Sequence, residues 1–119
     1  DAGRIGEAVS LLREGAETHL RLGEVVELVH DLIQLAEILL DAEAPDLAAQ
    51  VLAASEKLRN QTGFPLESWA AKEEAGVRGK VLAAMGDTAF SKAWEAGSEL
   101  SAEDAIAIAA PFEGSGEEG

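Results

Sequence analysis

The sequence predicts an all-α fold, a right-handed superhelical stack of about three helical hairpins. Apolar residues make up 47% of the 119 positions and are mostly Ala, Leu, Val and Ile. They recur every three or four positions, which is the spacing of one helix face. No run alternates β-branched with polar residues, as a half-buried strand would. A chain of this length is expected to form one domain.

The first two expected helices differ in how many apolar faces they carry. The first runs from Arg4 to Leu22 with a single stripe, and Gly23 ends it. Its stripe consists of Ile5, Val9, Leu12, Ala16 and Leu20. The second runs from Glu24 to Ala42 with two stripes, Val25, Leu28, Leu32, Ala36 and Leu39 on one face and Val26, Val29, Ile33 and Leu40 on the other. Two stripes need two neighbours, so the second helix should be sandwiched.

Proline marks the start of the next two expected helices. Pro45 opens a helix that runs to Thr62, and Gly63 closes it. Its apolar positions are Leu47, Val51, Leu52 and Leu58. Pro65 opens a fourth helix that runs to Met85, with inward positions expected at Leu66, Trp69, Val77, Val81, Leu82 and Met85. Gly76 and Gly79 lie inside this helix, where they either permit close helix approach or weaken it.

Residues 86–109 indicate a closing pair of helices. Phe90 and Trp94 are four residues apart and share one helix face. Gly97 is expected to end this helix. Ser101 is an expected N-cap of a last short helix, and the acidic pair 103–104 lies in the first turn of that helix. The helical domain therefore covers residues 1–110, and residues 111–119 (PFEGSGEEG) are expected to be a disordered acidic tail.

An internal repeat supports this layout. A shift of about 40 residues places four residues of the first helix and its turn over four of the third. The pairs are Ala8 with Ala48, Leu11 with Val51, Leu12 with Leu52, and Gly23 with Gly63. A period of about 40 is typical of helical solenoids close to the tetratricopeptide class.

The charge of the chain excludes several partners. The formal net charge is −14, and two stretches, 22–56 and 93–119, contain no Lys or Arg. Because phosphate binding requires clustered cations, we expect no direct nucleic-acid contact and no anionic membrane surface as partner. No transmembrane span or signal peptide is visible, and there is no Cys, so we expect a cytoplasmic protein without disulfides.

No motif in the chain predicts catalysis, a cofactor or a metal site. Glu27 and His30 have the E-x-x-H spacing of di-iron bundles, but such bundles need two pairs, and His19 has no comparable partner. Two His without Cys are too few for zinc. The serines fit no G-x-S-x-G or S-x-x-K pattern, and no Walker A or dinucleotide fingerprint occurs. We therefore expect a protein that is not an enzyme.

Three large aromatic residues are the candidates for an interaction site. Trp69, Phe90 and Trp94 have helical spacing, which favours burial in the core. The alternative is that they anchor a partner on a binding face, since Trp is enriched in interface hot spots.

Two stretches resemble a known family. VLAASEKLRNQTGFPLESW and VLAAMGDTAFSKAWEAGSELSAEDAIAIA are similar to the C-terminal tetratricopeptide-like domain of large bacterial signal-transduction ATPases, the MalT-like, LuxR-type transcriptional regulators. The resemblance is close over 48–109. The residues that carry it are Glu56, Leu58, Arg59, Gly63, Pro65, Gly86, Phe90, Ala93, Trp94, Gly97, Leu100, Ser101, Glu103 and Ala105. Met85 stands where the family often has Leu, and no helix-turn-helix follows Ala109.

The resemblance implies a regulatory and protein-interaction domain that senses an inducer or partner. Its partners would be a protein or the neighbouring domains of a longer parent regulator, with a small-molecule inducer or a homodimer as further possibilities. One alternative is the regulatory domain of a nucleotide-cyclase-type or kinase-type signalling ATPase. Others are a purely structural dimerisation module and a small-molecule sensor with a cavity in the stack.

Overall fold

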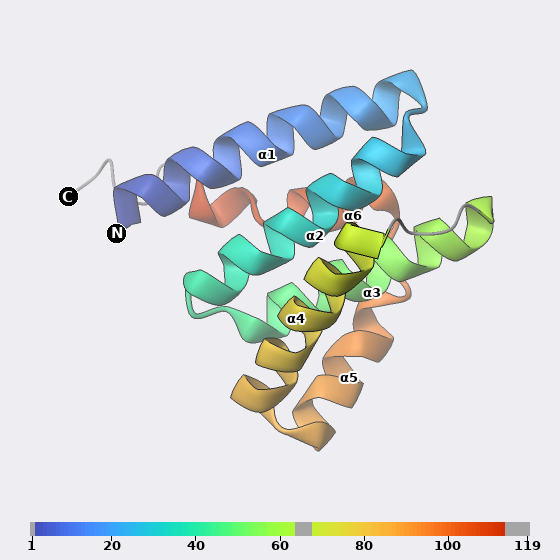
Figure 1. The fold of residues 1–119 in the computed structure, drawn as a ribbon. Helices are drawn as coiled ribbons and strands as arrows, with labels where there is room; N and C mark the ends of the chain where they lie inside the picture. The colour runs from blue at the N-terminus through green and yellow to red at the C-terminus, as the bar shows by residue number, and fades with distance from the viewer. Residues whose placement is uncertain (1, 64–67, 114–119) are drawn as a thin grey trace.

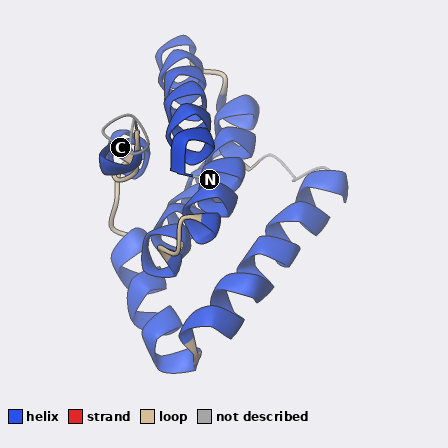
Figure 2. Ribbon diagram, turned by 90° about the vertical axis from the view of Figure 1, so that its left-hand side faces the viewer, coloured by secondary structure: helices blue, strands red, loops and turns tan. Residues whose placement is uncertain are grey.

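The computed structural model describes residues 2–63 and 68–113, and every regular element in these ranges is helical (Figures 1 and 2). This confirms the predicted all-α class. The elements are α1 (Ala2–Leu22), α2 (Val25–Asp41), α3 (Pro45–Thr62), α4 (Ser68–Met85), α5 (Asp87–Gly97), α6 (Ala102–Ala107) and the 3₁₀ turn η1 (Ala110–Phe112). None of the described helices is both long and apolar enough to cross a bilayer.

Helix α2 lies between α1 and α3, as its two apolar stripes predict (Figure 1). Seven of its residues are buried. Six of them come from one or other of the two predicted stripes, and the seventh, Leu35, lies outside both. Val9 and Ala16 of α1 enter the same core, and Leu12 packs against it. Burial of this continuous apolar surface is the main stabilising contribution to the α1–α2–α3 packing.

The boundaries of the helices follow the predicted signals within a few residues. Gly23, Gly63 and Gly86 have positive φ values of 74°, 73° and 85°, which glycine adopts without strain. The hydroxyl of Ser101 accepts a hydrogen bond from the Asp104 amide at 3.1 Å, so the N-cap is confirmed. The predicted start of the fourth helix at Pro65 lies outside the described residues.

Helix α3 is the centre of the second half, with α2 on one side and α5 on another. Gly97 is the last residue of α5 and is buried against α3. A Cβ at this position would lie 2.3 Å from the carbonyl oxygen and 2.5 Å from the Cα of Gln50. The glycine therefore serves close helix approach in addition to ending the helix.

The last elements return to the first helix. α6 packs against α1 and α3, and η1 packs against α1 (Figure 1). The Arg13 side chain donates to the Ile106 carbonyl at 2.9 Å and pairs with Glu113 at 2.9 Å. Residues 111–113 of the expected tail thus take part in the fold, and residues 114–119 lie outside the described residues.

Helix α4 lies at the outside of the molecule, in front in Figure 1 and along one edge in Figure 2. The prediction that Trp69 and Leu82 face inward is wrong, since they are 54% and 36% exposed. The buried positions are Ala70, Glu74, Val77 and Val81, a narrow stripe that includes one carboxylate. Because this buried stripe is narrow, apolar residues of α4 that lie outside it remain on the surface.

The structure also bears on two further sequence features, the repeat pair of Leu11 and Val51 and the two glycines inside α4. Leu11 is 63% exposed, whereas its repeat equivalent Val51 is fully buried. The two positions match in sequence but differ in burial. Gly76 and Gly79 would meet nothing within 4 Å if they carried a Cβ, so they do not serve close helix approach. Each weakens α4 by about 1 kcal/mol relative to Ala.

Candidate functional site

Phe90 and Trp94 of α5 form a stacked aromatic pair. Their ring centroids are 5.4 Å apart at an interplanar angle of 29°, so the predicted shared face is confirmed. Both side chains are partly buried and pack against the core from its margin. The guanidinium carbon of Arg78, on α4, lies 4.4 Å from the centroid of the Trp94 ring. Trp94 therefore has an aromatic neighbour and a cation.

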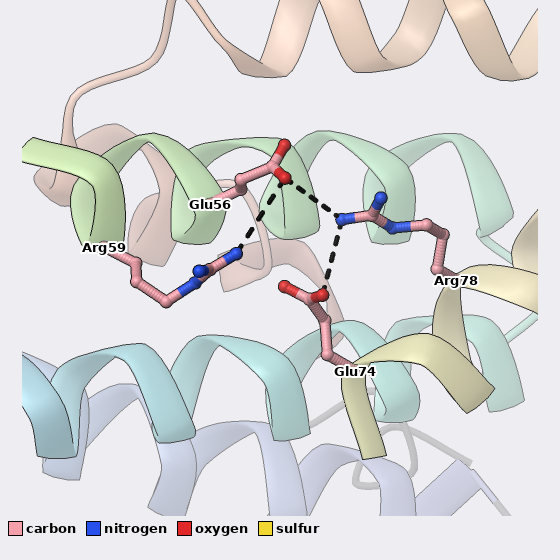
Figure 3. Close-up of polar contacts among 4 residues, drawn as sticks. All are labelled: Glu56, Arg59, Glu74 and Arg78. Carbon is pink, nitrogen blue, oxygen red and sulfur yellow. Dashed lines mark hydrogen bonds and ion pairs between the residues drawn. The ribbon is translucent and has the colours of Figure 1, made fainter. Parts of the chain in front are cut away.

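Arg78 also belongs to a group of four charged side chains between α3 and α4, which we call the Arg78 network (Figure 3). Its Nη2 atom is 3.5 Å from Glu56 Oε1 and 3.4 Å from Glu74 Oε1. Arg59 Nη2 is 3.9 Å from the same oxygen of Glu56. Charge-assisted hydrogen bonds are usually about 2.7–2.9 Å, so all three contacts are long.

The Arg78 network leaves polar atoms without partners. Glu74 is only 8% exposed, yet its Oε2 atom has no hydrogen-bond partner. Figure 3 shows this second oxygen on the side of Arg59. The Nε atoms of Arg59 and Arg78 are likewise buried and unpartnered. Buried polar groups normally have hydrogen-bond partners, so the Arg78 network is unusual in leaving three buried polar atoms unpaired.

Two hollows of about 440 and 370 Å³ flank Trp94 and share Glu56, Trp94 and Ser98. We call them together the Trp94 groove. It is lined by Ala53, Glu56, Lys57, Asn60, Gln61, Arg78, Phe90, Ser91, Trp94, Glu95 and Ser98. Helices α3, α4 and α5 all contribute. The groove therefore offers an aromatic face surrounded by carboxylates, cations, amides and hydroxyls.

Trp69, the third candidate, does not line this groove. Its ring lies against His30 of α2, with centroids 4.7 Å apart and planes at 52°. The expectation that it is a core residue is wrong, because more than half of it is exposed. The structure thus brings Phe90 and Trp94 together and places Trp69 at a different contact.

The E-x-x-H pair of α2 shows no sign of a metal centre in the described part of the chain. Glu27 is exposed, while His30 is partly buried against Trp69 and its Nε2 atom has no hydrogen-bond partner. Across the described ranges no group of three or more His, Asp and Glu side chains is placed to hold a metal ion.

His19, which lacks an E-x-x-H partner, has an ion-pair partner that the sequence spacing does not reveal. Its Nδ1 atom is 2.5 Å from Asp31 Oδ2, and its Nε2 atom is 3.9 Å from Glu24 Oε1. The hydrogen bond to Asp31 raises the pKa of His19 above its ordinary 6.5, and the charges of Asp31, Glu24 and Glu27 raise it further, against a lowering by burial. This ion pair joins the end of α1 to α2.

Sequence reasoning missed the Arg78 network as a unit, although a signal was present. Glu74 and Arg78 are four residues apart, and Glu56 and Arg59 are three apart, which are the spacings of side-chain pairs on helices. What the sequence does not show is that the two pairs face each other across 22 residues of chain.

Comparison of the chain with protein-family models, with curated proteins and with solved structures gave no match in any of the three.

Proposed function

We propose that the chain is a regulatory and protein-interaction domain that binds a polypeptide segment in the Trp94 groove and performs no catalysis of its own. The observation that carries the proposal is the partly exposed Trp94 ring, set between two hollows and beside an arginine. Trp is among the residue types most enriched in interface hot spots.

The proposal includes the tetratricopeptide-like architecture, with α1–α2 and α3–α4 as successive hairpins of a right-handed superhelical stack. The repeat of about 40 residues and the central position of α3 support it. The return of α6 to α1 is a departure from an open stack, and it would act as a cap on one end. The resemblance to LuxR-type regulators supports a role in a cytoplasmic bacterial signalling protein, with a cyclase-type or kinase-type ATPase as the alternative parent.

Selection from a random displayed-peptide library tests the proposed groove. We expect enriched peptides whose binding is lost in Trp94→Ala and kept in Trp69→Ala, the matched control at the other tryptophan. Trp69 is suitable because it is exposed and lies outside the groove. If the selected peptides bind Trp94→Ala as well as the wild type, or if no peptide is enriched, the proposal is contradicted.

A dimerisation module is a second candidate, because α4 exposes Trp69 and Leu82 on the outside of the molecule. The remaining outward positions of α4 are small or basic, so a second copy would meet few bulky side chains. Sedimentation equilibrium decides between monomer and dimer. A tight dimer that Trp69→Ala dissociates, with Trp94→Ala as control, would favour this function over peptide binding.

A further inference from the structure

Arg78 makes only long contacts with its two carboxylate neighbours. Its Nη2 atom reaches both carboxylates only at 3.4 and 3.5 Å, and its Nε atom has no hydrogen-bond partner. Its side chain is 36% exposed while it covers the Trp94 ring. A guanidinium with five donors normally forms shorter, paired bonds to a carboxylate. Arg78 is therefore displaceable from the ring.

The same site has acceptors that Arg78 leaves unused. Arg59 and Arg78 both contact Oε1 of Glu56, and Oε2 makes no hydrogen bond to the described residues. Glu56 borders both hollows, so this oxygen is accessible to a partner. The nine-tenths-buried carboxylate of Glu74 also has an unpartnered oxygen. Glu95 adds an exposed carboxylate at the border of the groove.

The charge of the whole chain favours a basic partner. The net charge is −14, which attracts cationic segments and repels acidic ones. The Arg78 network contributes two positive and two negative charges, so it does not itself oppose an incoming cation. Arginine fits better than lysine, because its planar guanidinium stacks on an indole while donating to a carboxylate in the same plane.

We propose, building on the function above, that the Trp94 groove binds an arginine side chain of a basic protein segment and that Arg78 occupies its place in the free protein. The partner's guanidinium stacks on Trp94 and pairs with the free oxygen of Glu56. Arg78 moves off the ring but stays beside Glu74, four residues away on its own helix, so the buried carboxylate keeps its cation. A competing internal group lowers the apparent affinity, so its removal must raise the affinity.

The test is a fluorescence-anisotropy titration with a labelled Gly-Ser-Arg repeat peptide. Matched peptides carry Lys or Glu in place of Arg. We expect the Arg peptide to bind, the Lys peptide to bind several-fold more weakly and the Glu peptide not to bind. Trp94→Leu should abolish binding of the Arg peptide, whereas Trp69→Leu should leave it unchanged.

The decisive variants remove Arg78. Arg78→Gln should bind the Arg peptide roughly two- to fivefold more tightly, the size of a cation–π contact at an exposed site. Because Arg78→Gln leaves Glu74 buried without a cation, the double variant Glu74→Gln/Arg78→Gln is the second arm, and it keeps the net charge at −14. Lys80→Gln, an exposed position outside the groove, controls for the charge lost in the single variant.

The outcomes separate this inference from the function on which it rests. Weaker or unchanged binding in both Arg78 variants, or equal binding of the Arg and Glu peptides, overturns the arginine proposal. If library selection still yields Trp94-dependent peptides without basic residues, the protein-interaction function stands while the arginine proposal fails. If no Trp94-dependent peptide exists, both fail.

Discussion

Replacement of Gly97 by Ala tests the close approach of α5 to α3. The added Cβ would lie 2.3 Å from the carbonyl oxygen of Gln50 and 2.8 Å from its carbonyl carbon. Ordinary contact begins at 3.4 Å, so α5 must move by about 1 Å. The obstacle is helix backbone, and α3 is held on another side by α2, so no side-chain rotation relieves the contact.

We expect Gly97→Ala to lower the free energy of unfolding by about 2–3 kcal/mol, the upper part of the range for overpacking. At about 4 °C per kcal/mol for a domain of this size, the melting temperature should fall by roughly 8–12 °C. Helical circular dichroism during urea and thermal unfolding measures both quantities.

Gly79→Ala is the matched control, because a Cβ there meets nothing within 4 Å. It should raise stability by about 0.5–1 kcal/mol through better helix propensity. Equal shifts in the two variants, or a Gly97→Ala protein as stable as the wild type, would refute the reasoning from the α3–α5 contact.

Substitutions at three further positions test other contacts. The folded-state pKa of His19 is raised, so its pairing with Asp31 stabilises fully below the ordinary pKa of 6.5 and loses this contribution as pH rises through the folded value. His19→Gln should therefore flatten the decline of the urea midpoint with pH, and an unchanged slope would contradict this assignment. Arg13→Met should cost about 1–2 kcal/mol and speed amide exchange in α6 without affecting α4, as native-state hydrogen exchange will measure. Ser101→Ala should cost about 1 kcal/mol in urea unfolding, and Ser101→Asp should restore it.

The parts of the fold that sequence predicts are those set by local chemistry. Gly23, Gly63 and Gly86 end helices because only glycine adopts their φ without strain, and Ser101 caps α6 through an amide three residues away. Such signals lie within one turn of chain. The two apolar stripes of α2 likewise follow from its own residues and require neighbours on both sides.

The parts that sequence does not predict depend on partners distant in the chain. Gly97 reads as a helix stop, and its contact with Gln50 is visible only in the folded chain. Trp69 is apolar enough for the core, but the buried stripe of α4 is built from small residues and a carboxylate instead. His19 lies twelve residues from Asp31, a distance that no helix periodicity connects.

The packing of α5 also accounts for the position of the candidate site. Trp94 and Gly97 are three residues apart and share the face of α5 that meets α3. Since Gly97 allows the backbones to touch at Gln50, Trp94 is brought to the level of Glu56, about one and two-thirds turns further along α3. A bulkier residue at 97 would push α5 away from α3 and would move the Trp94 ring away from Glu56. The glycine that sets the distance between two helices therefore also sets the width of the groove in which we propose that arginine binds.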